Sequence, residues 1–599
     1  MQKWISMRIL ALPLLWAAGT HAQELYWKNP GNYDFTAHNN AAPPEPSLPP
    51  GTPPGFDAAI AHPASQKYRI SGMEFLSDGR MVVTNWENFG RVGVIYLLTG
   101  VEGDKESIKA VPIATGIWEP YGLKVLNDEI FYTAQDGLWK LVRTAISPEK
   151  WEIKSVAKFI VPIKPEGGDF PIAFNTTYAN GKFYFSTGAY KNFNAPPLNE
   201  GYVVQIDPKT GAQEILGRGI RMPNGLGVNG PGDLFYADNQ GEYRPASEIF
   251  HVVKGRHYGM AAPDGKDGNT GGTMTKFLPL PPADSIAKPA ICIPYRPGSA
   301  SPTNMFYLQH TQFAGQFLIG DNAYGVVHRI FLEKVKGEYQ GANFQFSGVL
   351  EGGIQTFAEG PDGTIYGGTL GLPANGWLWL GKEDGMMKWK PNSNALSSII
   401  SVSSQREGFD LKFTEPLSAA AANPDYFWVT SYRYEATSSY GGPKLDVKKM
   451  KVASIKTSTD RQTLALSIEG LTAGRVYRID ISPSLKTASG AALWTKSAWY
   501  TLNQISDAEV LGTGISGIAP VRASLLHPEI TMTQGKCRIQ LPESGRFEVR
   551  LFDMKGSEMR KSNGVGPATS EISLPGPGIH FLKIGTASGF HSYTLGVPR

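Results

Sequence analysis

The sequence feature that most constrains the fold is a hairpin pattern that recurs six times between residues 68 and 370. Each copy has two short runs of alternating apolar residues, which favour strands, joined by a tight turn. Successive turns are about 50 residues apart, except for one interval of about 80 residues between the fourth and the fifth. The turns lie at Asp78-Gly79, Asn127-Asp128, Asn180-Gly181, Gly232, Gly315 and Asp362-Gly363.

Repeated units of this length, each with several strands, are typical of a β-propeller. A single four-stranded sheet cannot bury both of its faces, whereas a closed ring of sheets buries nearly all of them. We therefore expect a six-bladed β-propeller over residues 68–395. The alternative is a series of unrelated hairpins or β-sandwiches.

The remainder of the chain also indicates strands. A length of 599 residues, with 68 glycines and 44 prolines, favours several domains rich in turns. A linker rich in Ser and Asn begins at residue 392, and short strands with turn signals follow. We expect an immunoglobulin-like β-sandwich at 400–504 and a small C-terminal β-sandwich at 520–599. The predicted fold class is thus all-β.

The beginning of the chain has the pattern of a secretory signal. Lys3 and Arg8 precede an apolar run, and Ala22 ends a stretch of small residues. We expect a signal peptide at 1–22 and a proline-rich lead-in at 23–67. The protein is then secreted or on the cell surface, with no transmembrane segment. Two cysteines form no disulfide framework, and a net charge of +4 gives no case for nucleic acid.

Polar residues gather where strands of the fourth and fifth repeats end. Asp238-Asn239 follows a strand of the fourth repeat, and Asp321-Asn322 follows the equivalent strand of the fifth. Equivalent strand ends on neighbouring blades should share one face of the ring, so this face is the candidate site. A solvated turn is the alternative. The loop after Asp238 also contains Gln240, Gly241, Glu242 and Glu248.

The segment RMPNGLGVNGPGDLFYADNQGEYRPASEIFHVVKGRHYG, at 221–259, resembles the glucose/sorbosone dehydrogenase family of soluble quinoprotein sugar dehydrogenases. The resemblance covers roughly residues 68–504. The C-terminal pattern FEVRLFDMKG followed by PGIHFLKI is similar to sorting domains of type IX secretion. This similarity implies a partner in the secretion machinery.

The resemblance implies oxidation of a sugar by pyrroloquinoline quinone beside Ca²⁺. Residues for the cofactor would be Arg221, Asn224, Asp238, Gln240 and Asp321. Residues for the metal would be Gly241, Glu242, Glu248 and Tyr258, because carboxylate and carbonyl oxygens suit Ca²⁺.

The chain departs from the family at three positions. Asp169 stands near the place of the family's catalytic His and is the candidate base. Gly353 and Gln355 stand where the family has arginines that hold the quinone, so the quinone site is degraded.

Three functions follow from these residues. The first is an exported sugar or polyol dehydrogenase-like propeller with a degraded catalytic site. The second is a non-catalytic propeller that binds glycan or protein at the cell surface. The third is a hydrolase or lactonase, for which Glu74, Asn224 and Asp321 would surround Ca²⁺.

Overall fold

The computed structural model describes residues 51–87, 92–161, 173–190, 199–262, 277–295, 298–309, 311–360, 362–371, 384–509, 529–533, 536–553, 558–573, 578–586 and 589–597. The chain divides into two compact units, residues 1–514 and 515–599. The predicted signal peptide and Asp169 lie outside the described residues. Within those residues, no helix is long and apolar enough to cross a membrane.

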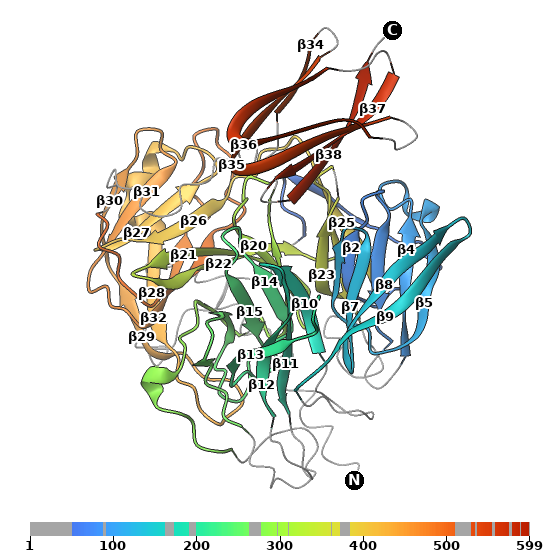
Figure 1. The fold of residues 1–599 in the computed structure, drawn as a ribbon. Coiled ribbons are helices and arrows are strands. Elements are labelled where there is room, and N and C mark those ends of the chain that lie inside the picture. Colours follow the sequence, from blue (N-terminus) through green and yellow to red (C-terminus); the bar gives the residue numbers. More distant parts are fainter. Residues whose placement is uncertain are drawn as a thin grey trace. The chain divides into compact units, whose positions relative to one another are not determined.

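Six antiparallel sheets make up most of the first unit (Figure 1). The first contains β2 (Ile70–Phe75), β3 (Met81–Asn85), β4 (Val92–Thr99) and β5 (Lys109–Trp118). The second contains β6 (Leu123–Leu126), β7 (Glu129–Ala134), β8 (Gly137–Ile146) and β9 (Glu149–Lys158). The third contains β10 (Ala173–Ala179), β11 (Lys182–Tyr190), β12 (Asn199–Ile206) and β13 (Gln213–Arg218), with β17 (Arg256–His257) parallel at its edge.

The other three sheets follow the same plan. The fourth contains β14 (Gly225–Val228), β15 (Leu234–Asp238), β16 (Ser247–His251) and β18 (Ile291–Ile293). The fifth contains β19 (Pro302–Tyr307), β20 (Phe317–Asp321), β21 (Val326–Val335) and β22 (Glu338–Gly348). The sixth contains β23 (Gly353–Glu359), β24 (Ile365–Leu370), β25 (Gly385–Pro391) and β1 (Phe56–Ile60).

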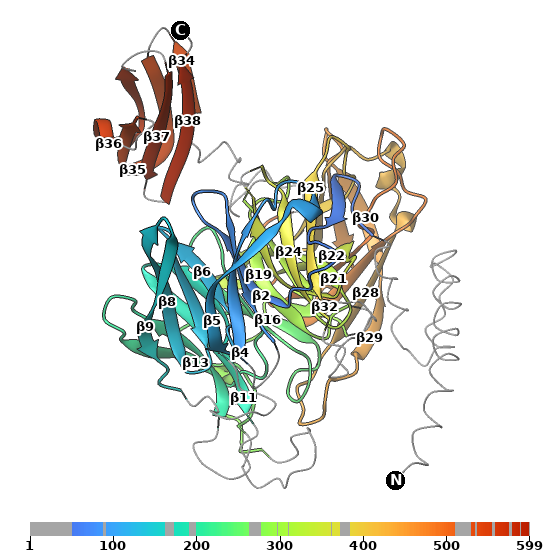
Figure 2. The ribbon, with the colours of Figure 1, turned by 90° about the vertical axis from the view of Figure 1, so that its right-hand side faces the viewer.

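The six sheets close into a ring. The first strand of each sheet contacts the first strand of the next, in the order β2, β6, β10, β14, β19, β23 and back to β2. A separate apolar cluster lies at each junction between sheets; Val82 and Ile95, for example, pack with Ile130 and Leu141. Figure 2 shows the outer strands β4, β5, β8 and β9 of one such junction. The predicted all-β fold with a β-propeller is confirmed.

The hairpin turns have the backbone that their residues predict. Asn127 and Asp128 have φ angles of 52° and 62°, and Asn180 has a φ angle of 51° before Gly181. Positive φ at both central residues defines the tight turn whose twist matches that of paired strands. These turns therefore set the register of the first two strands in the second and third sheets.

Strand β1 extends the ring beyond its predicted start at residue 68. It pairs antiparallel with β25, so the sixth sheet combines strands from both ends of the propeller. The sequence FDAAI has only its first residue buried, because β1 is an edge strand. Edge strands lack the apolar run by which a strand is recognised in a sequence. Strand β1 was therefore not predicted within the proline-rich lead-in.

A two-sheet sandwich follows the ring. One sheet contains β26 (Ile399–Ser404), β27 (Gly408–Phe413), β31 (Thr463–Ile468) and β30 (Val452–Thr457). The other contains β28 (Phe427–Arg433), β29 (Leu445–Met450), β32 (Arg475–Ile481) and β33 (Ser497–Leu502). Because β33 also pairs with β22, this second sheet continues the fifth propeller sheet as one eight-stranded sheet. The immunoglobulin-like assignment stays a prediction.

The second unit is one antiparallel sheet. It contains β34 (Glu529–Thr533), β35 (Lys536–Phe552), β36 (Glu558–Ser573), β37 (Gly578–Thr586) and β38 (Gly589–Val597). Strand β36 pairs along most of β35, and β34 and β37 share the other edge of β35. The apolar side chains from this sheet form their own core, which includes the free Cys537.

Candidate functional site

The loops at the ends of β15 and β20 lie together, as their repeated sequence predicts. Asn239 Nδ2 donates to Ser301 Oγ at 3.2 Å, and the Ser301 amide donates to Asp321 at 2.8 Å. The fourth and fifth sheets therefore present Asp238-Asn239 and Asp321-Asn322 on one face of the ring. We call it the candidate face.

Asp238 is a fully buried anchor of this face. Its carboxylate accepts hydrogen bonds from the backbone amides of Arg221, at 3.0 Å, and Met222, at 2.6 Å. A third bond comes from Arg244 Nε at 2.8 Å. All of these partners belong to the protein, so Asp238 holds the loop before β14 in place and has little capacity left for a ligand.

Asp321 has the same role in the fifth sheet. One oxygen accepts from Ser299 Oγ and the amides of Ala300 and Ser301, at 2.7 to 2.9 Å. The other accepts from the amides of Ala323, at 2.9 Å, and Tyr324. Both aspartates predicted to bind a cofactor thus act as turn anchors.

Arg221 is paired with the predicted metal ligand Glu242. Its Nε and Nη2 donate to Glu242 Oε2 at 2.9 and 2.8 Å. The Arg221 guanidinium also lies 5.1 Å from the centre of the Tyr440 ring, which belongs to the sandwich loop between β28 and β29. A Cβ atom at Gly241 would lie 2.0 Å from Arg221 Cζ, so this position needs a glycine.

The same sandwich loop makes further contacts with the residues around Gly241. Gln240 Nε2 donates to Tyr440 Oη at 3.1 Å, and the Gly441 amide donates to the Gly241 carbonyl at 2.9 Å. Nothing in the propeller sequence predicted Tyr440. Its contact with Gln240 spans 200 residues.

Glu248 is buried beside Arg244, which is also buried. Arg244 Nε is 3.5 Å from Glu248 Oε2 and 2.8 Å from Asp238. Burial, with a smaller contribution from Asp238, raises the pKa of Glu248 to about 8. Tyr258 Oη accepts from the Val253 amide at 2.8 Å, so its hydroxyl is committed to a neighbouring turn.

These partners do not fit Ca²⁺ at the predicted ligands. Glu242 is bound to Arg221, and Glu248 shares Arg244 with Asp238. The part of the chain that the structure describes contains no group of three or more His, Cys, Asp or Glu that could hold a metal. Glu74 belongs to the far end of β2, next to a hairpin turn, so the structure does not bring it to Asn224 and Asp321.

An amide network occupies the axis of the ring on the candidate face. Asn224 Oδ1 accepts from Tyr121 Oη at 3.0 Å and from Gln355 Nε2 at 2.8 Å, and the Asn224 carbonyl accepts from Asn175 at 2.7 Å. Gln355 is therefore a neutral partner of Asn224. Arg221 and Arg244, the arginines described on the candidate face, are already paired with carboxylates, so these residues do not fit the carboxylates of pyrroloquinoline quinone.

Three amide oxygens beside this network have no hydrogen-bond partner among the described residues. They are Asn239 Oδ1, Gln240 Oε1 and Asn322 Oδ1, and all three are shielded from solvent. Buried acceptors without donors are costly, so a hydroxyl group that reached these oxygens after a shift of the amide side chains would be bound favourably.

The fold defines the class of this protein as a β-propeller with an attached β-sandwich. No known family matches the chain, and no curated protein matches it. Among solved structures, it is similar to the quinone-bound aldose sugar dehydrogenase of Streptomyces coelicolor, with 14% identity and a TM-score of 0.40. That match covers 57% of this chain and 100% of the other.

Two further solved structures show the same degree of likeness. The pyranose dehydrogenase quinone domain of Coprinopsis cinerea has 12% identity and a TM-score of 0.40, over 58% of this chain and 98% of that one. A gluconolactonase of Xanthomonas campestris has 9% identity and a TM-score of 0.34, over 58% of this chain and 99% of that one. At these values the likeness assigns no substrate or cofactor to this chain.

Proposed function

We propose that this protein binds a carbohydrate or polyol on the candidate face and does not oxidise it with a quinone. The observation that carries the proposal is the set of three unpaired amide oxygens of Asn239, Gln240 and Asn322. Neutral amide acceptors suit hydroxyl donors, and sugar hydroxyls supply several donors at once. Tyr440, whose surface is 58% exposed, lies beside Gln240 and gives a sugar ring an aromatic surface.

The arginine pairing supports binding over oxidation. Arg221 is the residue that the resemblance assigns to the quinone, and its charge is matched by Glu242 under the Tyr440 ring. Gln355 is bound to Asn224 rather than charged. A tricarboxylate cofactor would therefore have to break existing pairs in order to bind.

The test is one preparation measured in two ways. Binding to a glycan and polyol panel is measured by calorimetry, and dye reduction is measured after incubation with pyrroloquinoline quinone and Ca²⁺. We expect binding without dye reduction. Sugar-dependent dye reduction would establish the dehydrogenase instead, and the absence of binding to any panel member would refute the proposed function.

Two substitutions locate the ligand. Asn239→Ala and Asn322→Ala should each weaken binding about tenfold, because each removes about one hydrogen bond to the ligand. Asn394→Ala, at an exposed amide after the ring, is the matched control and should leave affinity unchanged. Equal affinities for all three variants would place the ligand elsewhere.

We further propose that the protein is exported and that the second unit serves secretion. The apolar start of the chain and the C-terminal sequence pattern support this. Deleting residues 515–599 should retain the product inside the cell, while N-terminal sequencing of the exported protein should begin at Gln23. An unprocessed cytoplasmic product in the native host would refute export.

A further inference from the structure

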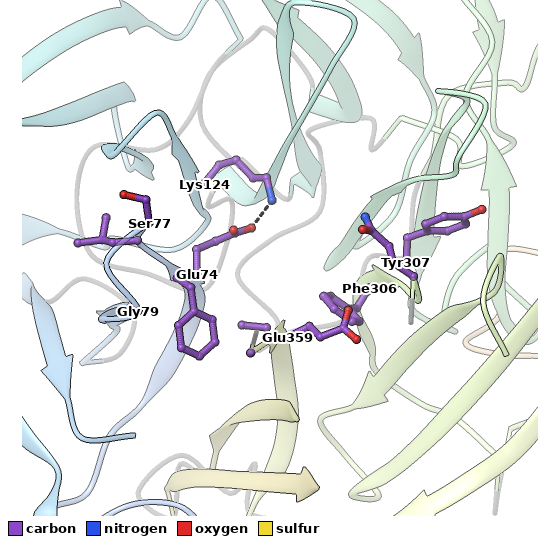
Figure 3. Close-up of a pocket in the computed structure, with 12 residues that line it drawn as sticks. Glu74, Ser77, Gly79, Lys124, Phe306, Tyr307 and Glu359 are labelled. Carbon is purple, nitrogen blue, oxygen red and sulfur yellow. Dashed lines mark hydrogen bonds and ion pairs between the residues drawn. The ribbon is translucent and has the colours of Figure 1, made fainter. Parts of the chain in front are cut away.

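A pocket of about 440 Å³ lies at the opposite end of the ring from the candidate face. It is formed by the far ends of β2, β6, β19 and β23 and by the turn after β2, as the hairpin pairings of these strands show. This volume is in the range of small-molecule sites. Phe75 and Phe306 contribute aromatic surface, and the charged groups are Glu74, Lys124 and Glu359 (Figure 3).

The charges of this pocket do not balance. Lys124 Nζ is paired with Glu74, which leaves that pair neutral (Figure 3). Glu359 lies on the other side of the pocket beside Phe306 and has no cation partner among the described residues. One of its oxygens, Oε1, is shielded from solvent and has no hydrogen-bond partner. An ionised Glu359 therefore gives the pocket one net negative charge next to aromatic rings.

The neighbours of Glu359 do not supply the missing positive charge. Asp128 is bound to Ser77 on the pocket rim, and Asp362 is bound to Thr364 in the turn after β23. Tyr307 adds a neutral phenol. Burial alone raises the pKa of Glu359 to about 7, as expected for a carboxyl group that lacks a compensating cation.

We propose that this pocket binds an organic cation, a ligand with a primary ammonium group on a small apolar or aromatic skeleton. The ammonium group would neutralise Glu359, and the faces of Phe75 and Phe306 would attract the same charge. An anionic ligand is disfavoured because Lys124, the one cation among the described residues that line the pocket, already has a partner. This site is separate from the candidate face and does not depend on the function proposed for it.

A matched pair of ligands tests the proposal on the full-length protein. The probes are 2-phenylethylammonium and 2-phenylethanol, which share a skeleton and differ in charge. We expect the ammonium compound to bind at least about tenfold more tightly by calorimetry or ligand-observed NMR. Binding of the ammonium compound requires the ionised form of Glu359. The affinity of that compound should therefore rise about tenfold between pH 6 and pH 8.

Variants connect the binding to Glu359. Glu359→Gln should weaken ammonium binding about tenfold and abolish its pH dependence. Glu152→Gln, which removes an exposed carboxylate on β9, is the control and should change neither. Lys124→Met should tighten ammonium binding, because it leaves Glu74 without its partner.

Three results would overturn the proposal: equal binding of the alcohol, an affinity that is flat with pH, or an unchanged Glu359→Gln variant. If Glu359→Gln does not fold, the pH profile and the alcohol comparison on the natural protein decide the matter. Loss of sugar binding on the candidate face would leave these measurements unaffected.

Discussion

At the scale of single residues, the charged side chains of the candidate face form ion pairs with one another. Glu242 is paired with Arg221, and Asp238 and Glu248 share Arg244. Burial raises the pKa of Glu248 to about 8, and Arg244, which Glu248 shares with Asp238, does not offset this rise. The electrostatic consequence is a pH dependence of stability.

The raised pKa of Glu248 fixes the sign of that dependence. Because the folded state holds the proton up to about pH 8 and the unfolded state releases it near pH 4.5, stability should fall as the pH rises between these values. One proton corresponds to a slope of about 1.4 kcal/mol per pH unit. Urea unfolding from pH 5 to pH 8 should show a shallower decline for Glu248→Gln; an identical decline would mean that Glu248 is ionised in the folded protein.

Gly241 provides a second prediction at this scale. Gly241→Ala places a methyl group against the Arg221 guanidinium, so the Arg221–Glu242 pair should separate, at a cost of about 1–3 kcal/mol in unfolding free energy. Gly337→Ala is the control: Gly337 also has a positive φ angle, but its Cβ would meet no atom within 4 Å. Equal losses for the two variants would attribute the effect to backbone strain alone.

At the scale of elements, a buried arginine joins the propeller to the sandwich. Arg329 on β21 donates to the carbonyls of Ile399 and Ile400, where β26 begins, and to Gln316. Its guanidinium lies 4.0 Å and 4.2 Å from the ring centres of Phe313 and Phe344. Within the described ranges no carboxylate is paired with Arg329, so the backbone carbonyls carry the interaction.

Arg329→Ala should therefore destabilise the first unit by about 3 kcal/mol or more, since it leaves buried carbonyls without donors. Arg433→Ala, at a half-exposed arginine paired with Glu435, should change stability by less than about 0.5 kcal/mol. Thermal and urea unfolding of both variants measure the difference. A small loss for Arg329→Ala would show that water replaces the guanidinium.

At the scale of the whole molecule, the first unit is closed by pairings between distant parts of the chain. Strand β1 completes the sixth sheet, and β33 of the sandwich continues the fifth. Phe56 on β1 packs in the cluster that includes Phe346 and Trp389. Closure therefore depends on residues that precede the repeated region.

Deleting residues 1–60 should cost several kcal/mol, because it removes β1 and the buried Phe56 ring. Deleting residues 1–50 leaves β1 in place and is the control. Calorimetry should show a lower transition temperature for the longer deletion only. Equal transition temperatures would mean that the ring is stable without its last outer strand.

The sequence alone determined the elements that depend on local physics. Alternating apolar residues and Asn, Asp or Gly turns specify hairpins within about 20 residues. The regular spacing of these hairpins predicted the closed ring of a β-propeller. Asp238 and Asp321 were correctly placed on one face, because equivalent positions in repeated sheets occupy equivalent places.

Only the tertiary structure decided what those side chains bind. Asn224 meets Gln355 across 131 residues, and Gln240 meets Tyr440 across 200. Local pattern carries no information about such partners, because they are set by how the sheets and the sandwich pack. For the same reason the sequence did not predict strand β1 or the unpaired charge of Glu359. Both depend on neighbours that come from other parts of the chain.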